Sequence, residues 1–326
     1  MYTPSDIFEI SSKKEFEKLT LKIFRFQYNN NLVYQRFCSL LKKNETNVKR
    51  IQDIPFLPVQ FFKSHTILSS TEKIQMTFTS SGTTGMMTSK HSVTDLAFYE
   101  ESYKQAFKQF YGNVENYIVL ALLPSYLERE GSSLIYMVND LIQLSNNSES
   151  GFYLNNYDEL IEKLIRLDAE GHNILLIGVT YALLDLVEKQ QFNLKNTIIM
   201  ETGGMKGRRK EIIREELHEI LSGGFGVSEI HSEYGMTELL SQAYSLGNGI
   251  FECPAWMKII IRDSEDALTL LPEGKVGGVN IIDLANVNSC SFIATQDLGK
   301  IIDNNSFEIL GRFDNSDIRG CNLMVV

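Results

Sequence analysis

The sequence predicts an α/β protein in which layered β-sheets are flanked by helices. Two observations support this class. Between residues 94 and 221, apolar runs of strand length alternate with amphipathic runs of helical length, a pattern typical of a sheet with helices on its faces. After Gly235, helical periodicity gives way to short strand-like runs separated by turn residues. We therefore expect one large layered domain whose second half is richer in β-structure.

The composition is that of an ordinary globular protein. The 326 residues are 43% apolar and 22% charged, with a net charge of −10, and they suffice for one large or two modest domains. The absence of a Lys/Arg-rich block argues against nucleic acid as a partner. We expect no membrane span and no secretory signal, because no apolar run is long enough. Four scattered cysteines fit a cytoplasmic location, with most of them packed in the core.

Residues 1–70 are expected to form a helical lead-in that packs on the main domain, 71–326. Apolar residues recur at helical spacing up to about residue 50. A proline-rich segment around Phe56 then forbids a continued helix, because proline lacks the N–H donor and biases the preceding residue toward extended backbone.

The main domain is expected to begin with alternating helices and strands. Apolar side chains form one face of a helix at 94–111, and Gly112 ends it. A continuous apolar run at 117–123 is typical of a buried strand, and Ser132 or Ser133 can cap the helix that follows, through Leu144. The further expected elements are helices at 157–170, 181–190 and 206–221, and strands at 174–179, 197–201, 257–262, 276–282, 291–295 and 306–310.

A stretch rich in Ser, Thr and Gly stands out at residues 78–85, with five hydroxyl side chains and two glycines. Glycine lets the backbone approach a ligand closely, and successive amides with nearby hydroxyls form a concave anion site. A polyphosphate is the expected guest, although composition alone more often produces an exposed loop. The spacing does not fit a Walker loop. The candidate phosphate-binding residues are Thr79, Ser80, Ser81, Gly82, Thr83, Thr84 and Gly85.

Four more motifs follow strand-like runs, where the ligands of α/β sheets gather. In chain order they are Glu201-Thr202-Gly203-Gly204, Tyr234-Gly235-Met236-Thr237-Glu238, Thr295-Gln296-Asp297 and Gly311-Arg312-Phe313-Asp314. The paired glycines would let a flat purine lie against the backbone, although taken alone they predict a tight turn. A carboxylate such as Glu238, beside phosphate oxygens, is a ligand that magnesium prefers.

Taken together and in this order, the five motifs resemble those of the acyl-adenylate-forming ligases, which join a carboxylic acid to AMP. The resemblance implies ATP and Mg²⁺ as cofactors and the large N-terminal domain of that ligase fold. It also implies roles: Gly203 and Gly204 lie against the purine, Tyr234 stacks on adenine, Thr237 contacts the α-phosphate, Glu238 binds magnesium, and Asp297 and Arg312 bind the ribose. Gly235 is counted among the cofactor-binding residues as part of the tyrosine motif. Gln296 stands where that family has glycine, which leaves the geometry of this loop open.

A narrower resemblance is to the LuxE-type acyl-protein synthetases, and it runs from about residue 55 to the end. The stretches that carry it are 78–85 with Ser89-Lys90-His91, 123–129 with Ser132-Ser133-Leu134, and 202–207. It implies that a fatty acid is activated to acyl-AMP with release of pyrophosphate. The acyl group then passes to a cysteine and onward to a partner protein.

Cys321 lies where the resemblance implies the acyl-accepting cysteine. A thiolate attacks an acyl-adenylate readily, and a neighbouring cation such as Arg319 would lower the pKa of the thiol. A buried, inert Cys321 is the alternative. The sequence stops at Val326, so we expect the usual mobile C-terminal domain, and the lysine that it supplies, to be lacking. Lys206, with Arg208 and Arg209, is a candidate to replace that lysine, or else a solvated residue at a helix start.

The acid itself cannot be named from the sequence, but loops with Tyr126, Ser132, Ser133, Val179 and Thr180 are expected to border its pocket. Two other functions stay open. One is a ligase that transfers the acyl group to coenzyme A or a carrier protein, similar to the phenylacetate–CoA ligases. The other is a nucleotide-binding protein that no longer completes acyl transfer.

Overall fold

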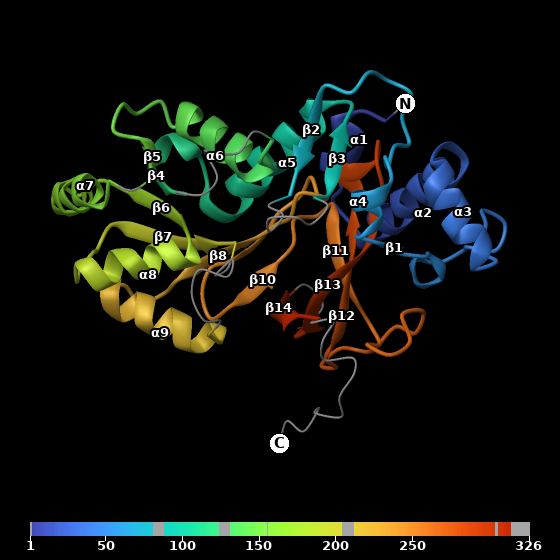
Figure 1. The fold of residues 1–326 in the computed structure, drawn as a ribbon. Helices are drawn as coiled ribbons and strands as arrows, with labels where there is room; N and C mark the ends of the chain where they lie inside the picture. Colours follow the sequence, from blue (N-terminus) through green and yellow to red (C-terminus); the bar gives the residue numbers. More distant parts are fainter. Residues whose placement is uncertain are drawn as a thin grey trace.

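The computed structural model describes residues 2–80, 88–123, 131–154, 156–203, 212–303 and 306–313. Within these residues a twelve-stranded sheet runs across the molecule in the order β11-β12-β13-β14-β10-β9-β8-β7-β6-β4-β5, with β1 beside β13 (Figure 1). A separate two-stranded sheet is formed by β2 (Met76–Thr79) and β3 (Lys90–Val93). No helix of this part of the chain is both long and apolar enough to cross a membrane.

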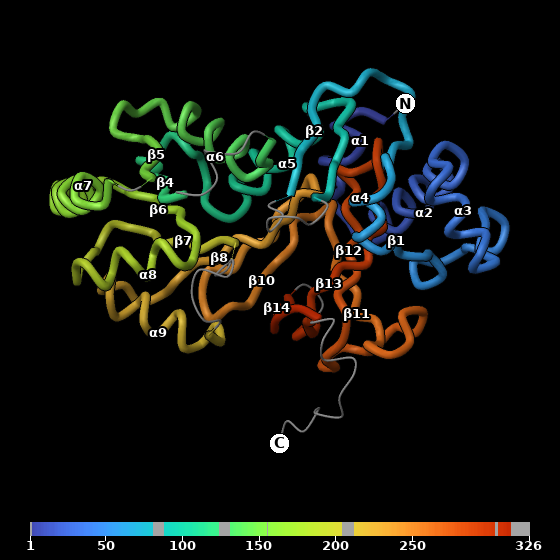
Figure 2. The backbone as a smooth tube through the Cα atoms, viewed as in Figure 1, coloured from blue at the N-terminus to red at the C-terminus, as the bar shows by residue number. Residues whose placement is uncertain are grey.

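The N-terminal segment packs on the antiparallel end of the sheet, beside β11, β12 and β13 (Figure 2). Its elements are α1 (Pro4–Phe8), α2 (Lys13–Asn30), α3 (Leu32–Leu40), β1 (Leu57–Pro58) and α4 (Phe61–Ser64). Side chains cap two of these helices: Ser12 accepts a hydrogen bond from the Glu15 amide, and Asn31 accepts one from the Tyr34 amide. The segment is therefore divided into separate helices. The last α-helix before the prolines ends at Leu40, and the 3-10 helix η1 (Ile51–Asp53) follows it. The boundary at residue 70 stays a prediction.

The parallel half of the large sheet contains β4 (Ile118–Leu122), β5 (Gly151–Tyr153), β6 (Ile174–Val179), β7 (Thr197–Thr202) and β8 (His231–Tyr234). The apolar runs predicted as strands β4, β6 and β7 are confirmed, and β4 and β6 are buried throughout. In Figure 1, α8 (Thr180–Lys189) and α9 (Arg214–Phe225) cover one face, and α5 (Leu96–Tyr111) and α6 (Ser133–Leu144) lie on the other, with α7 (Tyr157–Ala169) at the β5 end.

The predicted end of the helix at 206–221 was wrong. The helix continues through the glycine pair to Phe225 and ends at Gly226, whose φ of +71° is the left-handed conformation that glycine favours. Gly224 stays helical because it packs directly on Val187 of α8, and a Cβ there would lie 2.5 Å from the Val187 Cβ. The start of the predicted range lies outside the described residues.

The antiparallel half contains β9 (Ala243–Ser245), β10 (Ile250–Glu252), β11 (Met257–Arg262), β12 (Gly277–Asp283), β13 (Phe292–Ile301) and β14 (Ser306–Arg312). The predicted strand at 291–295 was too short, and the expected loop at Thr295–Asp297 lies inside β13. Gly311 and Arg312 also lie within a strand, β14. The strand β13 continues through its polar residues because Asp297 pairs directly with Arg312 of β14. The pairing of the two strands shifts register between Leu298 and Gly299.

Candidate active site

The carboxyl ends of three parallel strands bring distant motifs to one edge of the sheet. Val179 of β6 pairs with Thr202 of β7, and Thr202 pairs with Glu233 of β8. Gly203 follows directly, with a φ of +78° that favours glycine. The predicted substrate residues Val179 and Thr180 therefore lie next to the double-glycine motif, although both side chains are buried. Gly204 lies outside the described residues.

Tyr234, Asp297 and Arg312 meet, although they come from three separate motifs. The Tyr234 hydroxyl donates to Asp297 Oδ2 at 2.7 Å, and Arg312 Nε donates to Asp297 Oδ1 at 3.1 Å. Burial, followed by the charge of Asp297, raises the pKa of the Tyr234 phenol well above its ordinary value. The Arg312 side chain is 73% exposed, whereas that of Asp297 is 8% exposed. The pair thus combines a fixed carboxylate with a cation that faces solvent.

Aromatic packing fixes the ring of Tyr234. The edges of Phe251 and Phe307 contact it, with ring centroids 6.0 Å apart in both pairs. Edge-to-face packing of this kind holds a ring in one orientation. The predicted adenine-stacking residue is therefore rigid before any ligand binds.

The hairpin of β2 and β3 carries the predicted phosphate loop. Ser80 and Ser89 face each other at its base: the Ser89 amide donates to the Ser80 hydroxyl at 2.9 Å, and the Ser80 amide donates to the Ser89 carbonyl at 3.1 Å. Thr79 ends β2, and its amide donates to the Gly131 carbonyl at 2.8 Å. The loop residues Ser81, Gly82, Thr83, Thr84 and Gly85 lie outside the described residues. The base of the loop is thus closed and tied to the start of α6.

The segment Thr237-Glu238 lies against this hairpin. His91 of β3 places Nδ1 2.9 Å from the Thr237 carbonyl oxygen, and Asn286 donates to the Glu238 carbonyl at 2.8 Å. These contacts join residues 146 and 48 positions apart in the chain. The hairpin and the Thr237–Glu238 segment are therefore in direct contact.

Glu238 is the predicted magnesium ligand, and its surroundings fit that role. Burial raises the pKa of its carboxyl, and a hydrogen bond with Ser89 opposes the rise. No group of three or more His, Cys, Asp or Glu residues that could hold a metal occurs among the described residues. Magnesium is commonly held by one or two carboxylates together with substrate phosphates and water. A single carboxylate, such as that of Glu238, is sufficient for a site of this kind.

The start of α6 contains the predicted substrate residues Ser132 and Ser133. Ser132 is the N-cap, and its hydroxyl accepts a hydrogen bond from the Ile135 amide at 3.3 Å. The Ser133 carbonyl accepts one from the Tyr99 hydroxyl at 2.8 Å. The Ser132 hydroxyl is engaged in capping the helix, and that it also borders the pocket of the acid stays a prediction. Tyr126, Lys206 and Cys321 lie outside the described residues.

Two acidic residues near the site were not among the predicted functional residues. Glu201 accepts hydrogen bonds from Arg214 Nη1 at 2.7 Å and from Thr180 Oγ1 at 3.1 Å, and His218 Nε2 lies 3.7 Å away. Burial opposes ionisation of Glu201, but hydrogen bonding to His218 and the charge of Arg214 outweigh it, so the pKa is lowered. Because its partners come from α8 and α9, no local sequence signal identifies this network.

Glu233 is the second acidic residue. It pairs with Thr202, the neighbour of Glu201 on β7, so Glu233 and Glu201 lie on opposite faces of the sheet. Burial raises the pKa of its carboxyl to about 7, against a hydrogen bond that the Thr202 hydroxyl donates at 2.5 Å. The Glu233 carboxylate packs against Gly235, and a Cβ at that position would push the carboxylate aside. Its position immediately before Tyr234 was the one feature of the sequence that could have marked Glu233 as a residue near the site.

The described cysteines Cys38, Cys253 and Cys290 are free thiols. Burial raises the pKa of Cys38 to about 12, and it also raises the pKa values of Cys253 and Cys290. Raised pKa values make thiols poor nucleophiles at neutral pH. This agrees with the prediction that these three cysteines are structural.

Two solved structures illustrate the similarity in fold. The chain superposes on ATP-bound MatB from Rhodopseudomonas palustris with a TM-score of 0.56 and 16% identity, covering 74% of this chain and 49% of MatB. It superposes on an open conformation of 2-hydroxyisobutyryl-CoA ligase, in complex with 2-HIB-AMP and CoA, with a TM-score of 0.68 and 11% identity, covering 96% and 78% of the two chains. The chain spans about half the length of MatB. These likenesses confirm the predicted fold class.

Two relatives are similar in sequence. The long-chain-fatty-acid–luciferin-component ligase of Vibrio harveyi is 23% identical over 355 residues, which cover 99% of this chain and 90% of that protein. The ligase of the same name from Photorhabdus luminescens is 39% identical over 71 residues, which cover 22% of this chain and 60% of that protein. The family model described as acyl-protein synthetase, LuxE, matches residues 3–326. The chain therefore belongs to the LuxE family of acyl-protein synthetases.

Proposed function

We propose that this chain uses ATP to convert a carboxylic acid, expected to be a fatty acid, to acyl-AMP, and then passes the acyl group through a cysteine to a partner protein. The observation that carries the proposal is the junction of Tyr234, Asp297 and Arg312, three residues from separate motifs. Thr237, three residues after Tyr234, contacts His91 of the β2–β3 hairpin. Membership of the LuxE family supports it, and so do the names of the relatives, which specify a long-chain fatty acid.

The nucleoside would be bound by the Tyr234–Asp297–Arg312 group. Ribose hydroxyls are donors, and an ionised carboxylate offers about four acceptor positions, of which Tyr234 and Arg312 use two. Asp297 therefore keeps the capacity to accept both ribose hydroxyls. The exposed guanidinium of Arg312 is free to turn toward a ligand.

The triphosphate would lie between the hairpin and the Thr237–Glu238 segment. Bound magnesium would stabilise the negative charge that develops on the phosphates as pyrophosphate leaves. Glu238 would hold the ion, Thr237 would contact the α-phosphate, and Lys206 is the candidate cation that completes charge neutralisation. The substrate carboxylate oxygen attacks the α-phosphorus, the bond to pyrophosphate breaks, and acyl-AMP remains.

The transfer step would use Cys321. Its thiolate attacks the acyl carbonyl carbon, the acyl–phosphate bond breaks, and AMP leaves with the electron pair of that bond. The resulting thioester keeps the acyl group activated for transfer to an acceptor protein. The free thiols of Cys38, Cys253 and Cys290 are consistent with a reducing compartment, and the cytoplasm is the proposed location.

Pyrophosphate exchange with ATP, measured across a panel of fatty acids, tests the adenylation step. Replacing Glu238 by Gln removes the charge of the proposed magnesium ligand, so we expect exchange to fall by about a hundredfold. Glu252→Gln is the matched control, because Glu252 is exposed on β10. An unchanged exchange rate in the Glu238 variant, or no exchange in the parent with any acid, would contradict the proposal.

A labelled fatty acid tests the acceptor. Cys321→Ser should keep exchange and lose the hydroxylamine-sensitive protein label. Addition of coenzyme A separates the proposed activity from that of a CoA ligase, because only the latter would then release acyl-CoA. Retention of the label in the serine variant, or its location on Cys253 or Cys290, would show that Cys321 is not the acceptor.

A further inference from the structure

His91 is a buried imidazole between two parts of the site. Its side chain is 0% exposed and contacts the edge of the Phe62 ring, with centroids 5.6 Å apart. Nδ1 lies 2.9 Å from the Thr237 carbonyl oxygen, and Nε2 lies 3.0 Å from Asn286 Oδ1. Burying an imidazole removes both nitrogens from water, and only hydrogen bonds offset this cost. A ring that served only to fill space beside Phe62 would not need polar atoms here.

The segment that His91 contacts is held from several directions by buried polar groups. Asn286 ends the 3-10 helix η3 (Leu284–Asn286) and donates to the Glu238 carbonyl at 2.8 Å. Asp283, just before η3, accepts hydrogen bonds from the amides of Leu240 at 2.8 Å and Ser241 at 3.1 Å. Backbone groups of four of the five residues from Thr237 to Ser241 thus contact side chains from elsewhere. Of these side chains, His91 comes from the phosphate-loop hairpin.

We propose that His91 is a positioning residue that, with Asn286, clamps the Thr237–Glu238 backbone to the phosphate-loop hairpin and so sets the spacing at which a magnesium–triphosphate binds. The inference rests on the proposed function and deepens it. The clamp acts on the backbone of Thr237 and Glu238 and does not touch the ligand. It therefore affects binding of the triphosphate more than binding of the acid.

The two contacts can be separated by substitution. Both neighbours of the ring are oxygen atoms, and a neutral imidazole has one N–H, so the ring can donate to only one of them. The clamp assigns this N–H to Nδ1, which donates to the Thr237 carbonyl. Asparagine at this position keeps a donor close to where Nδ1 lies, facing Thr237. Glutamine keeps a donor close to where Nε2 lies, facing Asn286. The clamp predicts that the asparagine variant retains function and the glutamine variant does not.

The experiment measures equilibrium binding of a fluorescent ATP analogue with Mg²⁺, together with KM values for ATP and for the acid in pyrophosphate exchange. We expect His91→Ala and His91→Gln to raise the Kd and KM for magnesium–ATP about tenfold, the effect of losing one good hydrogen bond at the site. The KM for the acid should stay within about twofold, and His91→Asn should stay within about twofold of the parent in every constant.

Thr197→Val is the matched control for lost stability. It removes one buried hydrogen bond, 2.8 Å long, to Asp168 at the amino end of β7, far along the strand from the site. It should lower the melting temperature without changing the KM for ATP. Parent-like ATP binding in His91→Ala and His91→Gln would overturn the clamp. Equal impairment in all three His91 variants would also overturn it, because a merely structural role predicts that result.

Failure of the proposed function and failure of the clamp can be told apart, because ATP binding is measured directly and not only through pyrophosphate exchange. A parent protein that binds magnesium–ATP but exchanges no pyrophosphate would contradict the proposed function, while the binding constants of the His91 variants would still decide the clamp. A parent that exchanges pyrophosphate, with variants that bind ATP equally well, would contradict the clamp alone.

Discussion

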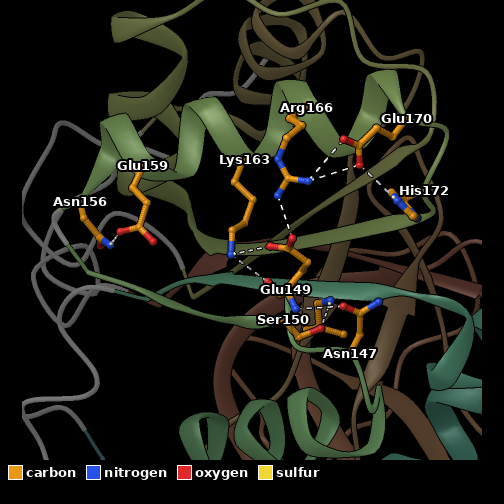
Figure 3. Close-up of polar contacts among 10 residues, drawn as sticks. Asn147, Glu149, Ser150, Asn156, Glu159, Lys163, Arg166, Glu170 and His172 are labelled. Carbon is orange, nitrogen blue, oxygen red and sulfur yellow. Dashed lines mark hydrogen bonds and ion pairs between the residues drawn. The ribbon is translucent and has the colours of Figure 1, made fainter.

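Two networks of Glu, Arg and His lie in different parts of this molecule and differ in burial. Around α7, Glu149 of the turn before β5 accepts from Lys163 at 3.0 Å and from Arg166 at 2.9 Å, and Glu170 pairs with Arg166 and His172, each at 3.3 Å (Figure 3). At the end of β7, Glu201 pairs with Arg214 at 2.7 Å and lies 3.7 Å from His218. The side chains are 35% exposed for Glu149 and 7% exposed for Glu201.

The comparison teaches that the same residue types stabilise differently according to their access to water. Exposed pairs gain little, because water and salt screen the charges. A buried pair gains more from its partner, but each charge also pays for lost hydration, so removing one partner leaves the other uncompensated. Glu201 lies two residues before Gly203, so its network also fixes the strand end that carries the double-glycine motif.

The largest expected effect is that of Arg214→Met. The substitution leaves the buried carboxylate of Glu201 without its closest cation, and breaking a buried pair costs about 3–5 kcal/mol of unfolding free energy. Urea denaturation at pH 7 measures it. A loss no greater than that of the surface variant Arg166→Met would mean that the two networks do not differ as their burial implies.

A smaller effect, and one that depends on pH, is expected for Glu233→Gln. Burial raises the folded-state pKa of Glu233 to about 7, above the usual value for an unfolded glutamate. The folded state therefore retains a proton that the unfolded state releases, and the free energy of unfolding falls as pH rises through the window from about 4.5 to 7. The contribution is at most roughly 3 kcal/mol, at 1.36 kcal/mol per pKa unit.

Glutamine removes this titration and can still accept from Thr202. The stability of Glu233→Gln relative to the parent should therefore rise between pH 5 and pH 8, as followed by urea denaturation at several pH values. Glu252→Gln, exposed on β10, serves as the control and should leave the slope unchanged. A relative stability of the Glu233 variant that is flat with pH would refute the assignment.

The smallest expected effect is that of Arg166→Met on α7. Its partners Glu149 and Glu170 stay solvated when the guanidinium is removed, so we expect no change in the urea midpoint beyond experimental error. Any residual difference should vanish when the salt concentration is raised to 1 M. A salt-independent loss would show that this exposed network is coupled to the fold more strongly than its geometry indicates.

Candidate site residues could be named from the sequence because the motifs that contain them are local. The five residues from Tyr234 to Glu238, together with Asp297 and Arg312, were named as candidates because their type and order resemble the motifs of a known ligase family. Buried strands such as Ile174–Val179 were equally accessible, since a continuous apolar run bounded by turn residues reflects burial on both faces. β8 was missed, because His231, Ser232, Glu233 and Tyr234 form no apolar run.

The sequence by itself therefore determined the α/β class, the positions of the apolar strands and the identity of the motif residues, because these depend on neighbours along the chain. The tertiary structure alone decided that Asp297 lies inside β13 opposite Arg312, that His91 reaches Thr237, and that Glu201 is neutralised by Arg214. Each of these depends on strand register or on helix packing. Burial by distant segments also sets the raised pKa of Glu233, and no local pattern encodes that burial.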